Sequence, residues 1–183
     1  MTVSDNPSAL RSQSEITQSL LSLMHQHPYS EITVKQIVLE SRLAKKTFYR
    51  NFSSKDDVLL SLIRRNITDY LHTVNTAQGG VLDTIFGFAA KNRELLTLLD
   101  KNGLLHLPLR CMNELIPDIT AAQDKQHNPF VPLFDGLDPE YLIALNTGAA
   151  WNVITLWIHS GADTPPDSIK AAVREYLSRI SAL

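Results

Sequence analysis

Five cationic side chains fall within fifteen residues of the chain, and no carboxylate falls among them. They lie in the stretch SRLAKKTFYRNFSSK, residues 41–55, where aromatic residues are interleaved with the charge. Lysine and arginine neutralise phosphates with release of counterions, and they also donate hydrogen bonds to base edges. The stretch therefore has the chemistry of a nucleic-acid contact. On charge alone, a solvated surface without a partner explains it equally well.

Helical spacing separates the aromatic anchors from the polar groups. Counted from Lys45, Phe48 and Phe52 are four residues apart and share one face, where they can pack into a core. Lys46 and Thr47 are candidates for base contacts, and Lys55 and Thr33 are candidates for phosphate contacts at helix starts. The residues assigned to the interface from this reasoning are Thr33, Lys45, Lys46, Thr47, Tyr49, Arg50 and Lys55.

The elements that must position these groups read as a helix-turn-helix. A first helix is predicted from Ser12 to His27, where Pro28 ends it. Thr33 and Gln36 have the spacing of a capping box and open a short helix, whose apolar side is Val34, Ile37 and Val38.

The turn and the next two helices follow directly. Residues 41–44 form the turn, and a third short helix runs from Lys45 to Asn51. Ser54 and Asp57 make a second capping box, which opens a long amphipathic helix.

Beyond residue 76 the pattern stays helical, with no stretch that alternates as a strand does. Helices are predicted over 81–91, 93–102, 104–118, 138–160 and 164–181, with a loop over 119–137. The chain is therefore predicted to be all-α. Its expected parts are a flexible tail over 1–11, a helix-turn-helix domain over 12–56 and a helical domain over 57–183.

Composition narrows the class of protein. Residues 1–60 hold seven Lys/Arg and six Asp/Glu, whereas residues from 76 onward hold eight and twelve, so positive charge is local. One cysteine excludes an internal disulfide, and neither a secretory signal nor an apolar run of about 20 residues occurs. We expect a cytoplasmic protein without a membrane segment.

Signatures of catalysis and of metal binding are missing from the sequence. It contains no glycine-rich phosphate loop, nucleophile elbow or His-Glu metal motif, and its six histidines lack ligand spacing. We therefore expect no enzyme, no catalytic residues, no cofactor and no metal.

The helix predicted over 138–160 is apolar on nearly all sides, so it must be covered on nearly all sides. A partner subunit that forms a four-helix interface with the last helix is the economical hypothesis, and a helix central to its own domain is the alternative. The expected homodimer interface comprises Leu145, Gly148, Ala149, Val153, Leu156, Ala172, Val173 and Tyr176.

The motifs T-F-Y-x-x-F-x-x-K-x-x-L, from Thr47, and P-Y-x-x-I-T-V-x-x-I, from Pro28, resemble the helix-turn-helix of TetR/AcrR-type transcriptional regulators. The resemblance covers about residues 12–60, and the end of the chain is similar to one branch of that family. It implies a nine-helix dimer on a palindromic DNA operator, with a C-terminal cavity for a small-molecule effector. By the family pattern, Asn51 joins the residues that touch DNA.

The turn departs from the family pattern of Ala-Gly-Val-Ser in two places. Arg42 stands where a glycine often takes positive φ, at a cost of about 1 kcal/mol. Ala44 stands where the N-cap of the recognition helix usually lies, a loss of about 1 kcal/mol. A reshaped turn and an added phosphate contact by Arg42 are expected.

An effector cavity in the C-terminal part requires apolar and aromatic lining. The candidates are Phe86, Phe88, His106, Cys111, Met112 and Trp151. Each of them is explained equally well as a residue that packs in the core and lines no cavity. We predict a sequence-specific regulator, a repressor controlled by a small ligand. The alternative is a helical dimer addressed to DNA whose C-terminal domain binds a protein partner and no small molecule.

Overall fold

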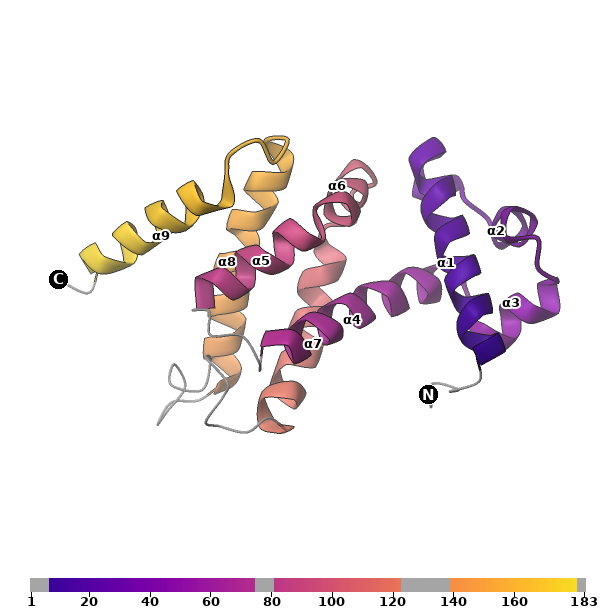
Figure 1. The fold of residues 1–183 in the computed structure, drawn as a ribbon, viewed down its shortest axis with the longest axis horizontal. Helices are drawn as coiled ribbons and strands as arrows, with labels where there is room; N and C mark the ends of the chain where they lie inside the picture. Colours follow the sequence, from indigo (N-terminus) through magenta and orange to yellow (C-terminus); the bar gives the residue numbers. More distant parts are fainter. Residues whose placement is uncertain (1–6, 75–80, 123–138, 181–183) are drawn as a thin grey trace. The chain divides into compact units, whose positions relative to one another are not determined.

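The computed structural model describes residues 7–74, 81–122 and 139–180. Within these ranges it contains α-helices, one short 3-10 helix and no strand, so the all-α prediction is confirmed (Figure 1). The helices are α1 (Pro7–Gln26), η1 (3-10, Tyr29–Glu31), α2 (Val34–Ser41), α3 (Lys45–Asn51), α4 (Lys55–Val74), α5 (Val81–Lys91), α6 (Arg93–Lys101), α7 (His106–Ala122), α8 (Pro139–His159) and α9 (Pro166–Ile180).

The chain divides into two compact units, an N-terminal unit of residues 1–65 and a C-terminal unit of residues 66–183. The division falls inside α4, whereas the sequence predicted a boundary at residue 56, just after this helix begins. The difference arises because Val58, Leu59 and Ile63 of α4 are buried and belong to the N-terminal unit.

In the N-terminal unit, α1 packs against both α2 and α3. Its core contains Ile16, Leu20, Ile37 and Phe48, each at most 1 % exposed. These apolar side chains come from three short segments whose helical spacing places them on one face, so burial of that face holds the three helices together.

Helix α1 begins at Pro7, five residues before the predicted start at Ser12. The tail predicted over residues 1–11 is therefore helical from Pro7 onward. Proline suits the first helical position, where its missing N–H costs nothing. The buried Ser12 hydroxyl donates to the Ser8 carbonyl at 3.0 Å, so a polar side chain occupies a core-facing site that apolar periodicity does not reveal.

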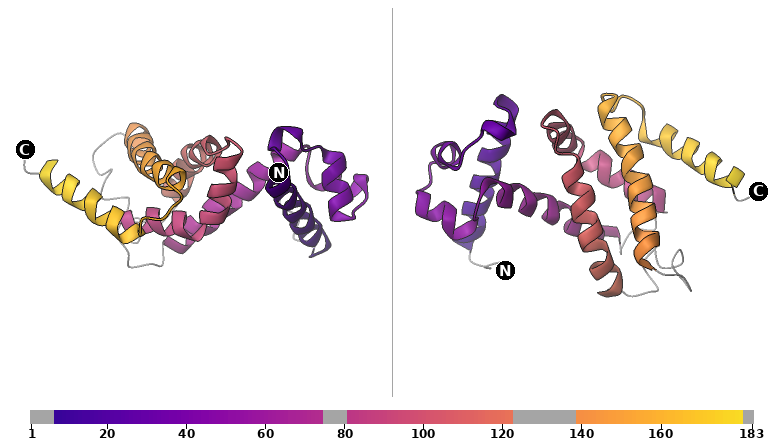
Figure 2. Two further views of the ribbon diagram at one scale, coloured as in Figure 1. Left: turned by 90° about the horizontal axis from the view of Figure 1, so that it is seen from above. Right: turned by 180° about the vertical axis from the view of Figure 1, so that it is seen from behind.

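In the C-terminal unit, α8 packs against α5, α6 and α7, while α9 packs against α5 (Figure 2). The turn from α8 to α9 is held by backbone bonds at Gly161 and Ala162, both with positive φ. The indole N–H of Trp157 donates to the Thr164 carbonyl at 2.8 Å across the same turn. The start of α9 is therefore fixed by α8.

The C-terminal end of α7 differs from the sequence-based expectation. Helix α7 continues through Pro117 to Ala122, although proline was expected to end it near residue 118. The predicted loop over 119–137 therefore begins later, and from residue 123 it lies outside the described residues.

Candidate nucleic-acid interface

Helix α3 is anchored by its phenylalanines and presents its polar side chains to solvent. Phe48 is 0 % exposed and Phe52 is 6 % exposed, with ring centroids 6.3 Å apart. Tyr49, in contrast, is 52 % exposed, and Lys45 and Lys46 are exposed as well. One side of a seven-residue helix thus anchors it while the opposite side remains free for a partner.

The exposed side of α3 carries positive charge that no carboxylate in the described part of the chain neutralises. Arg42, Lys45, Lys46 and Arg50 are all exposed, and none of them pairs with a carboxylate of residues 7–74, 81–122 or 139–180. The Lys45 ammonium lies 5.8 Å from the centre of the Tyr49 ring. Uncompensated cations beside an exposed tyrosine are suited to phosphates.

The two remaining polar residues of α3 are half-buried. Asn51 donates from Nδ2 to the Thr47 carbonyl at 2.8 Å, a bond internal to the helix. The amide of Asn51 therefore caps its own helix, and its expected contact with DNA stays a prediction. Thr47 lies on the first turn, next to the exposed Lys46.

In the turn between α2 and α3, Arg42 takes the positive φ that the resemblance implied for the glycine usually found at this position. Arg42 has φ 54° and ψ 23°, so a non-glycine residue occupies the left-handed region at the C-cap of α2. Ala44 is the N-cap of α3 and provides no side-chain hydrogen bond. The recognition helix therefore starts without the cap that serine or threonine provides.

The capping box of α2 forms as predicted. The Thr33 hydroxyl accepts from the Gln36 N–H at 3.3 Å, and the Gln36 side chain accepts from the Thr33 N–H at 2.8 Å. The same hydroxyl donates to Gln36 Oε1 at 2.7 Å. Because the hydroxyl is committed to the helix, a phosphate contact here falls to the free backbone N–H groups of the first turn.

Lys55 is placed differently from the other cations. It is half-buried at the first position of α4, and its ammonium lies within hydrogen-bond distance of three backbone carbonyls of residues 29–32. The phosphate contact predicted for Lys55 has no free donor in this arrangement, because a lysine has three N–H donors.

A groove between α2 and α3 contains residues that the sequence did not single out for binding. It has a volume of about 370 Å³ and is lined by Val34, Lys35, Val38, Leu39, Lys45 and Tyr49. Val34 and Val38 were expected in the core with Ile37, but Ile37 alone is buried in α2. The missed signal is Lys35 and Leu39, which are four apart and therefore on one face with the valines.

The predicted ligand-pocket residues differ in how far they are buried. Phe86, Phe88, Cys111 and Trp151 are buried, Met112 is half-buried and His106 is exposed. The Trp151 indole donates to the Leu105 carbonyl at 3.0 Å, and Phe88 packs edge-on against Tyr70. His106 therefore does not face the interior, while the buried members contribute to packing within the C-terminal unit.

The predicted interface residues on α8 and α9 remain accessible. Leu145, Leu156 and Tyr176 are 66 %, 70 % and 63 % exposed, and Gly148 has no neighbour within 4 Å of where a Cβ would lie. Tyr141, 74 % exposed, extends the apolar side of α8 by one turn. In the part of the chain that the structure describes, α8 alone is long and apolar enough to cross a membrane, a weak signal that core helices share.

The same ranges contain no group of three or more His, Cys, Asp or Glu side chains arranged to hold a metal ion.

Comparison with known proteins gives one family match. Residues 16–62 match the model of the bacterial regulatory proteins of the tetR family. The N-terminal unit carries a TetR-type DNA-binding domain. The matched range contains α2, α3 and the start of α4, with most of α1, so the TetR-type match and the exposed cationic helix coincide. The chain is accordingly a DNA-binding transcriptional regulator.

Two solved structures share the fold over nearly the whole chain. The fatty acid degradation regulator FadR from Bacillus halodurans aligns at 20 % identity and TM-score 0.56, over 90 % of this chain and 93 % of its own. The dihydroxyacetone kinase operon activator DhaS aligns at 19 % identity and TM-score 0.56, over 94 % and 97 %. A comparison with curated protein sequences gave no match. The similarity in fold therefore extends beyond the domain that the family model matches.

Proposed function

We propose that this regulator binds a palindromic operator as a homodimer, acts as a repressor and responds to a small ligand in its C-terminal unit. The observation that carries the DNA-binding part is α3, whose phenylalanines are buried while Lys45, Lys46, Tyr49 and Arg50 are exposed. A helix held in this way can enter a major groove without unfolding its core.

Selection of bound duplexes from a random library, with the purified full chain, tests sequence-specific binding. An inverted repeat with half-sites separated by about one helical turn, or a multiple of it, supports a dimer on an operator. Enrichment of a single half-site, or of no motif, contradicts this proposal.

Lys46 is proposed to read a base, and its substitution separates base reading from phosphate binding. Lys46→Ala should lower operator affinity by about 1–3 kcal/mol at the contacted base pair and relax the preference there. Tyr49→Phe is the control, because loss of a phosphate contact weakens binding to all sequences alike. Equal losses for Lys46→Ala on operator and random duplex contradict the base-reading role.

The ligand is proposed to be apolar, because a cavity formed among Phe86, Phe88, Cys111 and Trp151, which are buried in the C-terminal unit, would have an apolar lining. A ligand that controls the regulator should raise its melting temperature and change its affinity for the selected operator. If no apolar compound of a varied panel both raises the melting temperature and changes operator affinity, the effector proposal fails. The alternative, a C-terminal unit that binds a protein partner, is then favoured.

A further inference from the structure

The ammonium of Lys55 lies in a cluster of backbone carbonyls. Lys55 Nζ donates to the carbonyls of Tyr29 at 2.6 Å, Ile32 at 2.8 Å and Ser30 at 3.3 Å. It also lies 4.5 Å from the centre of the Tyr29 ring. Three carbonyls use all three N–H donors of a lysine, and the ring adds a cation–π contact.

A second bond joins the same two segments. The Tyr29 hydroxyl donates to Asp56 Oδ1, next to Lys55 in the first turn of α4. Burial, and then the Asp56 carboxylate, raise the pKa of Tyr29, so the hydroxyl stays protonated as a donor. We call Tyr29, Ser30, Ile32, Lys55 and Asp56 the Tyr29 clamp.

The clamp changes the electrostatics of the α4 N-terminus. Asp56 and Asp57 occupy its first turn, and Asp57 accepts from the Ser53 N–H at 2.8 Å. Asp56 is exposed, whereas the Lys55 ammonium is turned toward the η1 segment. A helix start with two carboxylates and no available ammonium is a poor phosphate site, because the acids already occupy the positive end of the helix dipole.

We propose that Lys55 is a positioning residue and not a DNA contact: it holds the carbonyls of residues 29–32 and thereby fixes where Thr33 begins α2. The phosphates are bound instead on the α2–α3 side, by the exposed Lys35, Arg42, Lys45 and other cations of α3. This inference rests on the proposed DNA binding, and it reverses the role that the sequence predicted for Lys55.

Salt dependence of binding to a fluorescein-labelled random-sequence duplex separates the two roles. Each phosphate contact contributes about 0.9 to the slope of log K against log salt concentration. Lys45→Met, which removes an exposed cation, should lower the slope by about 0.9. Lys55→Met should leave the slope of the wild type unchanged while it weakens binding. A slope lowered by about 0.9 in Lys55→Met overturns the positioning role.

Hydrogen exchange gives a readout that does not depend on DNA. Amides of residues 29–36 should exchange roughly tenfold faster in Lys55→Met, since charge-assisted bonds to three carbonyls are lost. Lys45→Met should leave these amides as in the wild type. Unchanged exchange in Lys55→Met contradicts the clamp.

Lys55→Arg covers the case in which Lys55→Met does not fold. Arginine keeps the charge, but its planar fork cannot direct three donors to three converging carbonyls. Faster exchange over residues 29–36 with a wild-type salt slope supports the positioning role, and exchange like that of the wild type overturns it. If the wild-type chain itself shows no salt-dependent DNA binding, the proposed function fails, and exchange alone then decides whether Lys55 holds the clamp.

Discussion

Arg42 occupies a backbone conformation that glycine adopts at little cost. Its φ of 54° puts it in the left-handed region at the end of α2, where the side chain is exposed. The next helix starts at Ala44 without a side-chain cap. Both residues therefore weaken the turn. We propose that the exposed guanidinium of Arg42 compensates for this cost as a DNA contact.

Arg42→Gly should raise the free energy of unfolding by about 0.5–1 kcal/mol, because relief of left-handed strain exceeds the added freedom of the unfolded chain. The same change should lower the salt slope of DNA binding by about 0.9 if Arg42 contacts a phosphate. Urea titration measures the first effect, and fluorescence anisotropy of a labelled duplex measures the second. Arg42→Lys is the matched control, since it keeps both the charge and the strain; a stability gain in this variant would contradict the explanation.

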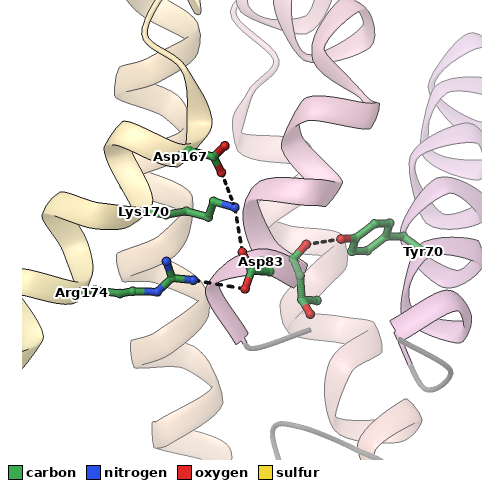
Figure 3. A network of polar contacts seen from close by, with 6 residues as sticks. Tyr70, Asp83, Asp167, Lys170 and Arg174 are labelled. Carbon is green, nitrogen blue, oxygen red and sulfur yellow. Dashed lines mark hydrogen bonds and ion pairs between the residues drawn. The ribbon is translucent and has the colours of Figure 1, made fainter. Parts of the chain in front are cut away.

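At the scale of elements, α5 contacts two helices through different chemistry. The Tyr70 hydroxyl of α4 donates to the Thr84 carbonyl, and burial raises the pKa of Tyr70, so it remains a donor. On another side, Asp83 of α5 binds Lys170 at 2.7 Å and Arg174 at 3.2 Å, both from α9 (Figure 3). The contact between α4 and α5 depends on close approach of the two helices, whereas the contact between α5 and α9 depends on charge.

Close approach of Tyr70 requires Gly87. A Cβ at Gly87 would lie 2.6 Å from the Tyr70 hydroxyl oxygen, so Gly87→Ala should destabilise the fold by about 1–3 kcal/mol despite the better helix propensity of alanine. Tyr70→Phe removes the obstructing atom, and the double variant should be more stable than Gly87→Ala alone. Thermal unfolding of the four proteins measures the coupling, and strictly additive effects would exclude this contact as the reason for the glycine.

The attachment of α9 to α5 depends on the Asp83 carboxylate. Asp83→Asn should make the amides of α9 exchange a few-fold faster, a modest effect because these ion pairs are partly exposed. Asp167→Asn is the matched control: it removes the other partner of Lys170, which lies on α9 itself at 2.7 Å. Equal effects of the two changes would contradict a special role for Asp83.

The same attachment predicts a pH dependence. Hydrogen bonds to Asp167, and then to Asp83, raise the pKa of Lys170 above its ordinary value of 10.5. A raised folded-state pKa stabilises the folded form below pH 10.5, and this contribution is lost as the pH rises through the folded value. The factor by which Asp83→Asn speeds amide hydrogen exchange in α9 should therefore be the same at pH 6 and at pH 8.

At the scale of the whole molecule, the apolar residues left exposed on α8 and α9 call for a covering surface. Tyr141, Leu145 and Leu156 of α8 are each at least 66 % exposed, and Tyr176 and Leu177 of α9 are 63 % and 48 % exposed. Large apolar side chains grouped on two consecutive helices mark an interaction site. A second copy of this chain is the covering surface that we propose, because a two-fold dimer brings identical surfaces together.

Leu156→Glu should separate the proposed dimer, because a carboxylate would be buried at the interface. The expected loss is at least about 2 kcal/mol, or roughly thirtyfold in the dissociation constant. Sedimentation at micromolar concentration measures it. Leu10→Glu in α1, 46 % exposed, is the matched control and should not change the association. A wild-type chain that sediments as a monomer would rule out the dimer.

Local features of this chain were predictable because they depend on neighbours in sequence. The capping box of Thr33 and Gln36 and the burial of Phe48 and Phe52 each follow from residues within a few positions of one another, whereas the positive φ of Arg42 was implied by the resemblance to the family's turn. Helical spacing and cap geometry are short-range properties, so sequence alone determined the exposed cationic side of α3.

Tertiary structure decided the features that depend on distant partners. Lys55 was predicted to bind a phosphate because it stands in the first turn of a helix, where backbone N–H groups are free, but carbonyls 23 to 26 positions earlier hold its ammonium. Val34 and Val38 have core composition, yet they line a surface groove because α1 covers only the Ile37 side of α2. Which way a long or apolar side chain turns is set by the groups that fold against it, and only the packed chain brings those groups together.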